Sequence, residues 1–515
     1  MKYPIGIQDF GKLRTEGYLY IDKTRLVYEL VQTGSYYFLS RPRRFGKSLL
    51  VSTLEAYLSG RRELFHGLDI ERLETEWTAY PILHIDLNTG KYTSAEALQA
   101  VLNNVLSLFE ETYGASPSET TPELRFQGII RRAAEQAGRP VVILIDEYDK
   151  PMLQAIGNED LLDEYRAALK AFYSVMKTQD RYIKFAFLTG VTKFGKVSVF
   201  SDLNNLEDLS MLSRWSELCG ITEREIHMYL EEEIDALARA NGLTAEEACQ
   251  RLRRAYDGYH FSENSVGIYN PFSLLNTFKN RAFGDYWFET GTPTFLVELL
   301  KKAEYNLNNL SGEEQTADML NSIDSMNTDP IPIIYQSGYL TVKSYDEEFR
   351  QYRLGFPNEE VERGFNRYLL PFYSPLGERK SEFAVNQFVT DIRKGDAESF
   401  LERLQAFFAD GDYEVMGRME LYFQNVMYVI FKIMGFYVEV EKRTARGRVD
   451  VVLKTADYIY VIEVKRDGSA DEALRQIDEK GYAEPFRKDG RKLFRIGINF
   501  SSEKKTVDGY RVLEG

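Results

Sequence analysis

The sequence predicts an α/β protein with a parallel-sheet domain in its N-terminal half and a smaller α/β domain at its C-terminal end. Three observations predict it. Short apolar runs alternate with helical patterns over residues 1–215, which is typical of a parallel sheet. Residues 36–58 combine a strand, a tight loop and a helix around the tripeptide G-K-S. Residues 448–465 combine two short strands with acidic side chains and a lysine.

Composition limits the class of protein. A chain of 515 residues is long enough for roughly three or four domains. The formal net charge of −15 argues against coating of nucleic acid by the whole molecule, although it permits a local basic groove. With only 4 histidines, a histidine-based zinc site or catalytic triad is not expected. Cys219 and Cys249 have no metal-ligand spacing, and so few cysteines fit a reducing cytoplasm.

The sequence carries no membrane signal. Its first residues run into a mixed polar segment rather than into an apolar leader. No stretch approaches the roughly 20 apolar residues of a membrane span. We therefore expect a cytoplasmic protein with no membrane partner.

The segment 36–54, YYFLSRPRRFGKSLLVSTL, contains the end of a phosphate-binding loop but not its beginning. The usual pattern, G-x-x-x-x-G-K-[ST], begins with a glycine, and here that place holds Arg41. The context still favours a nucleotide site, because a strand-like run precedes the loop and apolar residues at helical spacing follow it. Loop amides and a helix N-terminus would then point at the same anion. The alternative is a plain surface loop.

Two carboxylates follow a predicted buried strand. Residues 141–145, VVILI, form a continuous apolar run, which indicates a strand buried on both faces. Asp146 and Glu147 come directly after it, at the edge of a parallel sheet where ligands bind. We expect Asp146 to hold Mg²⁺ through water and Glu147 to orient or activate the attacking water. The alternative is a strand that merely ends in an acidic turn.

Two further strands complete the predicted sheet, at residues 80–87 and in the apolar run that ends at Thr189. Thr192 lies just beyond this second run. A hydroxyl here could contact the γ-phosphate or the attacking water, or it could equally cap the next turn. The sequence alone does not separate these two roles.

Eight segments that occur in order carry a resemblance to a known family: PIGIQDFGKLRTEGYLYIDKT, RPRRFGKSLL, LIDEYDKP, LTGVTKF, YDGYHF, YNPFSLL, QSGYLT and LGFPNEEV. The resemblance covers almost the whole chain. The series resembles the AAA-ATPase-like family whose members carry a C-terminal PD-(D/E)XK nuclease-like domain. In that family R-P-R-R-F-G-K-S is the usual form of the loop. The resemblance therefore implies a P-loop NTPase in which arginine, here Arg41, replaces the first glycine of the loop.

The resemblance implies ATP and Mg²⁺ as cofactors of the N-terminal domain. We expect ATP contacts from the loop and the two strand ends, at Arg44, Phe45, Gly46, Lys47, Ser48, Leu49, Asp146 and Thr189. Mg²⁺ is expected at Ser48 and Asp146, and Glu147 is the expected catalytic residue of ATP hydrolysis.

We divide the chain into a P-loop ATPase core at 1–215, a helical lid at 216–300, a winged-helix-like region at 301–365, a helical linker at 366–395 and a nuclease-like domain at 396–515. In the lid, one helix is expected to begin after Thr222, with a capping box to Glu225, and to end at Gly242.

The winged-helix-like region at 301–365 is predicted to contain a helix, a turn at Gly338 and two strands. Such a unit binds nucleic acid or docks domains, and the lack of a marked basic cluster favours docking.

The C-terminal pattern predicts a hairpin that pairs two acids. The strands are expected at residues 449–453 and 458–464, with the turn between Ala456 and Asp457. This register places Asp450 opposite Glu463. Because side chains alternate along a strand, Lys465 lies on the same face as Glu463. Both faces are apolar, so the carboxylates are expected to be partly buried, which is costly unless they bind a cation.

The pattern D…E-x-K on a hairpin resembles the core of PD-(D/E)XK nucleases. Asp450 and Glu463 are then expected to hold Mg²⁺, with Lys465 positioning or activating water and Glu420 as a further metal ligand. Downstream, Gln476 and Lys480 share a helical face that suits phosphate contacts. Val449 stands where the family pattern has proline.

The leading functional hypothesis is an ATPase coupled to a metal-dependent nuclease. Residues 440–511 have more basic than acidic side chains in an acidic protein, which favours nucleic acid, DNA in the first place, as the partner of this domain. We expect the ATPase to be a regulatory switch rather than a motor, and the chain to be capable of homo-oligomer formation. A biological role in defence or in the control of mobile elements is inferred by analogy. The alternative is a non-catalytic, ATP-gated scaffold whose nuclease fold only grips nucleic acid.

Overall fold

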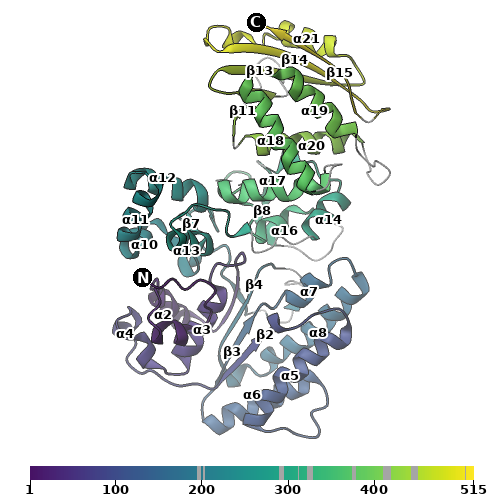
Figure 1. The fold of residues 1–515 in the computed structure, drawn as a ribbon. Helices are drawn as coiled ribbons and strands as arrows, with labels where there is room; N and C mark the ends of the chain where they lie inside the picture. Colours follow the sequence, from purple (N-terminus) through teal and green to yellow (C-terminus); the bar gives the residue numbers. More distant parts are fainter. Residues whose placement is uncertain are drawn as a thin grey trace. The chain divides into compact units, whose positions relative to one another are not determined.

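The computed structural model describes residues 1–193, 199–200, 203, 205–288, 295–310, 312–321, 329–373, 378–409, 419–435, 437–441, 451–504 and 506–515. The chain forms two compact units. Unit 1 comprises Met1–Leu299 and Ser311–Val361, and unit 2 comprises Leu300–Leu310 and Glu362–Gly515. Figure 1 shows their elements, coloured along the chain.

Unit 1 is built on a five-stranded sheet with the order β2-β3-β4-β1-β5. Its strands are β1 (Tyr36–Ser40), β2 (Ile82–Asp86), β3 (Val141–Asp146), β4 (Ile183–Gly190) and β5 (Glu207–Asp208). All neighbouring strands are parallel, so their carboxyl ends meet at one edge. β1, β3 and β4 are almost wholly buried, which explains their continuous apolar runs. β2 is buried only in part. The predicted parallel sheet is confirmed.

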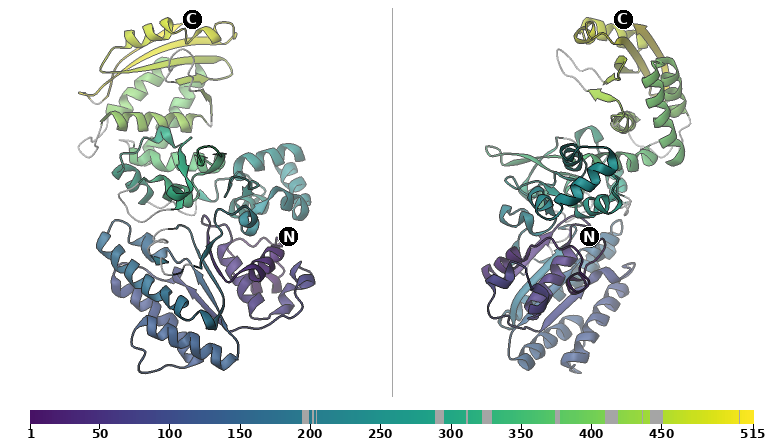
Figure 2. Two further views of the ribbon diagram at one scale, coloured as in Figure 1. Left: turned by 180° about the vertical axis from the view of Figure 1, so that it is seen from behind. Right: turned by 60° about the vertical axis from the view of Figure 1, so that its left-hand side comes forward.

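Helices cover both faces of this sheet (Figure 1, Figure 2). On one side lie α1 (Phe10–Thr15), α2 (Thr24–Thr33), α3 (Lys47–Leu58) and α4 (Ile70–Leu73). On the other lie α5 (Ala95–Tyr113), α6 (Pro122–Ala137), α7 (Lys150–Gln154) and α8 (Glu159–Thr178). α3 packs against β3, so the helix that begins at Lys47 runs back along the strand that ends in Asp146.

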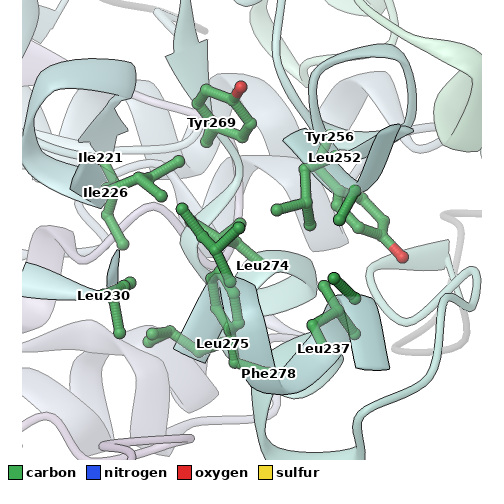
Figure 3. Packing of buried hydrophobic residues seen from close by; sticks show 13 residues of the cluster. Ile221, Ile226, Leu230, Leu237, Leu252, Tyr256, Tyr269, Leu274, Leu275 and Phe278 are labelled. Atoms are coloured by element: carbon green, nitrogen blue, oxygen red, sulfur yellow. The ribbon is translucent and has the colours of Figure 1, made fainter. Parts of the chain in front are cut away.

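A helical subdomain follows the sheet in unit 1. It contains α10 (Glu223–Tyr229), α11 (Glu231–Asn241), α12 (Ala245–Tyr256), α13 (Pro271–Asn280) and a two-stranded ladder of β6 (Ile221–Thr222) with β7 (Ile268–Tyr269). These elements share a core, of which Figure 3 shows 13 residues as sticks. Leu274 lies in the middle of this view, between side chains of the other helices. Burial of this core holds the subdomain together.

The expected single helix after Thr222 is two helices, so this prediction was wrong in one respect. The capping box of Thr222 with Glu225 and the left-handed end at Gly242 are both present. The chain breaks at Leu230, which stays buried in the shared core. The next turn, EEE at 231–233, supplies three acidic side chains, which favour a new helix N-terminus.

The last part of unit 1 has α15 (Ala317–Asn321), α16 (Ile331–Gln336) and an antiparallel sheet of β8 (Glu314–Thr316), β10 (Gln351–Gly355) and β9 (Thr341–Asp346). The helix, the glycine turn at Gly338 and the two strands follow the predicted order. Leu300–Leu310 belong to unit 2, although we placed residues 301–310 with this region. There Leu307 donates its N–H to the Asn425 side chain at 2.9 Å, which ties the segment to helix α20.

Unit 2 packs helices against a second five-stranded sheet, with the order β11-β12-β13-β14-β15. The strands are β11 (Glu439–Glu441), β12 (Val451–Lys454), β13 (Tyr458–Arg466), β14 (Lys492–Ser501) and β15 (Thr506–Glu514). The helices are α17 (Glu359–Tyr373) and α14 (Phe295–Lys302), which both begin in unit 1, with α18 (Glu378–Lys394), α19 (Ala397–Ala409), α20 (Met419–Met434) and α21 (Ala470–Glu479). Only the β13–β14 pair is parallel, and α21 makes the connection between these two strands.

Candidate nucleotide and nuclease sites

The phosphate-loop candidate connects β1 to α3. The strand ends at Ser40 and the helix begins at Lys47, with Gly46 as the residue before it. Gly46 has φ 92° and Arg44 has φ 68°, so these two residues supply the left-handed turns of the loop. Arg41 is not among the residues with positive φ, so this position has no conformational need for glycine.

Lys47 lies under the loop rather than in solvent. Its side chain is almost wholly buried, and Nζ donates to the carbonyl oxygens of Arg41 at 3.1 Å and Pro42 at 3.4 Å. The Glu147 carboxylate lies 3.6 Å from Nζ. Glu147 itself has φ 54°, an uncommon backbone conformation for a residue other than glycine. The sheet therefore brings the lysine of the loop and the glutamate of the β3 end into direct electrostatic contact.

Asp146 lies beside the first turn of α3. It is 4% exposed, and burial raises the pKa of its carboxyl group, with a further rise from the nearby charge of Glu147. A hydrogen bond from the Ser48 side chain acts in the opposite direction. A hydroxyl and a buried carboxylate in contact are the oxygen donors that Mg²⁺ uses at phosphate sites. The residues present therefore fit this metal ion.

A cavity of about 400 Å³ opens in front of the loop. Small-molecule sites span about 300–1,000 Å³, so its size suits a nucleotide. Loop residues 43–49 and Glu147 line part of it, and these include the predicted Arg44, Phe45, Gly46, Lys47, Ser48 and Leu49. Apolar residues line much of the rest, among them Ile5, Ile7, Leu218, Ile221, Phe272 and Leu275.

Asp146 and Thr189 are not among the residues that line this cavity. Asp146 reaches the site through Ser48, as described above. Thr189 is fully buried in β4 and gives its carbonyl to the N–H of Tyr148 at 3.0 Å. Its expected contact with ATP therefore stays a prediction that the lining of the cavity does not support.

Asp149 is a further acid at this sheet edge, which the sequence analysis did not single out. It is fully buried and accepts hydrogen bonds from Val191 N–H at 3.3 Å and from the N–H and hydroxyl of Thr192 at 2.7 and 2.8 Å. Burial raises the pKa of Asp149 to about 6. Thr192 therefore joins the end of β4 to the acidic loop. Its contact with the γ-phosphate or the attacking water stays a prediction.

The C-terminal hairpin has the predicted register. Val451 pairs with Ile462, and Lys454 pairs with Ile459 next to the turn. Glu463 is 3% exposed, which confirms that this carboxylate is buried. Lys465 is on the same face, with Nζ 3.3 Å from Glu463 Oε1.

Gln476 of α21 completes this cluster. Its side-chain N–H donates to Glu463 Oε1, and its carbonyl oxygen accepts from Lys465 Nζ. We expected Gln476 on a helical face that suits phosphate contacts, whereas its amide bridges the two predicted catalytic side chains. Gly497 of β14 lies opposite Glu463 in the ladder, and a Cβ there would come within 2.2 Å of the Ala470 carbonyl oxygen. The glycine therefore lets α21 approach the sheet closely enough for this bridge.

Two predicted metal ligands cannot be placed. Asp450 lies outside the described residues, and Glu420 is in α20 at a point where only the backbone is described. Within the described residues there is no cluster of three acidic, histidine or cysteine side chains that could hold a metal ion. The nuclease site is thus described in part, through Glu463, Lys465 and Gln476.

Comparison with known proteins identifies a domain at each end of the chain. Residues 4–200 match the family described as "Predicted AAA-ATPase", and residues 418–509 match the "PD-(D/E)XK nuclease superfamily". The "Uncharacterized protein in vnfD 5'region" of Azotobacter chroococcum mcd 1 is 36% identical over 523 residues, which is 99% of this chain and 98% of that protein. This chain belongs to the AAA-ATPase-like family with a C-terminal PD-(D/E)XK nuclease-like domain. The resemblance read from its segments is confirmed.

One solved structure similar to this AAA-ATPase-like protein is titled "Structure of the Aeropyrum Pernix ORC2 protein (ADPNP-ADP complexes)". Its sequence identity to the present chain is 9%, and the TM-score is 0.26. The aligned region covers 66% of the present chain and 92% of the ORC2 chain. A likeness this slight supports no argument about the present molecule. Among the described residues, no helix is long and apolar enough to cross a membrane.

The close approach of α21 gives a prediction for the nuclease-like domain of this AAA-ATPase-like protein. Gly497→Ala is expected to cost about 1–3 kcal/mol of stability, because the new methyl group meets backbone rather than a movable side chain. A denaturant titration followed in the nuclease-like domain measures it. Gly509→Ala on β15 is the matched control, since nothing lies within 4 Å of its Cβ position. Equal stability of the two variants would contradict the packing described here.

Proposed function

We propose that the N-terminal unit binds and hydrolyses ATP with Mg²⁺, and that the C-terminal domain cuts nucleic acid with a divalent metal ion. The observation that carries the first half is the meeting of Lys47, Ser48 and Glu147 in the lining of a 400 Å³ cavity, with Asp146 directly behind Ser48. This arrangement brings together a cation for the phosphates, oxygen donors for a metal ion and a carboxylate for the attacking water.

Each part of ATP has a counterpart in the cavity. The phosphates suit the loop, where the amides of the turn and the N-terminus of α3 converge. The base suits the apolar part of the lining, to which Ile5, Leu218 and Leu275 contribute. Ser48 and Asp146 would hold Mg²⁺, which supplies charge neutralisation for the phosphates. Lys47 exchanges its contact with Glu147 for contacts with phosphate, which frees Glu147 to act on water.

The second half of the proposal rests on the buried Glu463. A buried carboxylate beside a lysine, bridged by an amide, is a built arrangement rather than a solvated surface pair. We propose that Glu463 and Asp450 hold the metal ion, with Glu420 as an additional ligand, and that Lys465 orients or activates water. DNA is the proposed substrate, and the basic side chains of residues 440–511 suit its phosphates.

We further propose that ATP acts as a switch for cutting and that the region with β9 and β10 docks domains rather than reading bases. The turn of that hairpin, residues 346–350, contains three acidic side chains and one arginine, which does not suit contact with phosphates. Cys219 and Cys249 are free thiols, which fits a cytoplasmic protein. Assembly into a homo-oligomer is part of the same proposal.

The test of the ATPase proposal is Glu147→Gln. We expect this variant to bind ATP within a few-fold of the parent protein but to hydrolyse it about 10²–10⁴-fold more slowly, because the amide cannot accept a proton from water. Calorimetric titration measures binding, and phosphate release measures hydrolysis. Glu135→Gln is the control, because this exposed side chain is on α6, outside the cavity lining. Undiminished hydrolysis by Glu147→Gln would remove its catalytic assignment.

A further inference from the structure

The residue that replaces the first glycine of the loop has a structural role of its own. Arg41 is 1% exposed. Its Nη1 donates to the carbonyl oxygens of Ser40 and Ser210, each at 2.9 Å, and its Nη2 donates to the carbonyl oxygen of Trp215 at 3.3 Å. The guanidinium lies 3.9 Å from the centre of the Phe261 ring. Arg41 therefore joins the loop to two segments that lie far along the chain.

These contacts are an uncommon way to bury a charge. Within the described residues, Arg41 forms no ion pair with a carboxylate, so carbonyl dipoles and an aromatic face take that place. Burial lowers the pKa of Arg41 to about 10, which still leaves the group charged at neutral pH. Such a set of partners depends on the planar, forked shape of the guanidinium, which a lysine does not have.

The backbone of Arg41 reaches the catalytic parts of the nucleotide site. Its N–H donates to the carbonyl oxygen of Gly190, at the end of β4, at 3.3 Å. Its carbonyl oxygen accepts from Lys47 Nζ at 3.1 Å. The Arg41 side chain thus holds the Arg41 peptide group in place. This peptide group in turn contacts Lys47, the residue that is expected to bind phosphate.

Neighbouring loop residues are held from the same side. Phe45 packs edge-on against Tyr259, with ring centres 4.8 Å apart. A Cβ at Gly338 would come within 2.5 Å of Pro42, so this glycine is needed for the close approach of the loop. The loop is therefore fixed by side chains packed behind it, where a glycine-rich loop would depend on its own backbone. This also explains why the YDGYHF and QSGYLT segments accompany the altered loop in this sequence.

We propose that Arg41 is a positioning residue for the nucleotide phosphates, and that restoring the usual glycine at this place weakens ATP binding instead of improving it. The proposal rests on the proposed ATP-binding function. It makes Arg41 act through the loop and Lys47, not by touching the nucleotide. Its effect must therefore fall on ligands with a β-phosphate and spare ligands that use only the apolar part of the cavity lining.

The experiment titrates full-length parent protein, Arg41→Gly and Arg41→Lys with ATP, ADP and adenosine in a calorimeter. For Arg41→Gly we expect a dissociation constant about tenfold or more higher for ATP and ADP, the size of effect that loss of a hydrogen bond to a charged group produces, with no change for adenosine. Arg41→Lys should fall between this variant and the parent. The control is Arg125→Ala, because Arg125 is also largely buried, in an ion pair with Glu110 remote from the cavity.

The outcomes separate the two proposals. ATP binding by Arg41→Gly that equals the parent overturns the positioning role, and so does an equal loss for ATP and adenosine, which would indicate general loosening of the unit. A similar loss in Arg125→Ala would overturn it as well. If Arg41→Gly does not fold, parent-like ATP affinity of Arg41→Lys overturns the role instead. A parent protein that binds neither ATP nor ADP contradicts the proposed function itself.

Discussion

Replacing Lys47 by alanine is expected to raise the dissociation constant for ATP by about 100-fold or more, which corresponds to about 2.7 kcal/mol. The ammonium group is the point charge nearest to the predicted place of the β- and γ-phosphates. It is also the partner of Glu147 in the structure, at 3.6 Å, so its removal leaves that carboxylate facing the phosphates without a counter-charge. Calorimetric titration with ATP and Mg²⁺ measures the change.

Lys184→Ala provides the control for this prediction. Lys184 is exposed and lies in β4, in the same sheet but outside the cavity lining. We expect it to bind ATP like the parent protein and to unfold at a similar temperature. If Lys47→Ala binds ATP with parental affinity, the assignment of residues 41–48 as the phosphate loop is wrong.

Exchange of Glu463 for glutamine is expected to reduce metal-dependent cleavage by at least about 100-fold, because loss of a direct ligand should exceed the 10–100-fold loss seen for outer-shell partners. The amide keeps the size of the side chain but removes the charge that a buried cation requires. ATP hydrolysis should remain close to that of the parent protein, since Glu463 belongs to unit 2 and the nucleotide cavity to unit 1.

Glu514→Gln is the matched variant in the same domain, because this exposed acid on β15 pairs with Lys492 and not with the cluster. It should cut nucleic acid at the parental rate. Cleavage that survives in Glu463→Gln would place the metal site elsewhere. Loss of cleavage together with loss of ATP hydrolysis would show damage beyond the nuclease site.

Local patterns were enough to predict the strands and the loop that carry the two candidate sites. The apolar run at 141–145 and the G-K-S tripeptide indicated a parallel sheet with a loop at its carboxyl edge, because such a run between turn signals is typical of a strand buried on both faces. The short turn at 455–457 left few registers for the hairpin, so the ladder position of Glu463 could be predicted from residue spacing alone.

Long-range contacts explain what the sequence did not reveal. The partners of Arg41 lie near residues 210, 215 and 261, and no local pattern connects them to the loop. The bridge of Gln476 depends on how closely α21 approaches β14, which Gly497 permits. The break at Leu230 follows from packing in the helical subdomain. Tertiary packing overrode helical periodicity there.

The measurement that tests the central claim most directly is nucleic-acid cleavage as a function of nucleotide. Single- and double-stranded DNA and RNA are incubated with Mg²⁺ or Mn²⁺ and the full-length protein, with and without ATP, and in parallel with Lys47→Ala. We expect metal-dependent cutting of at least one substrate, at a rate that changes with ATP in the parent protein and does not change in the variant. A protein that cuts none of these substrates with either metal, or cuts them at a rate indifferent to ATP, would contradict this expectation.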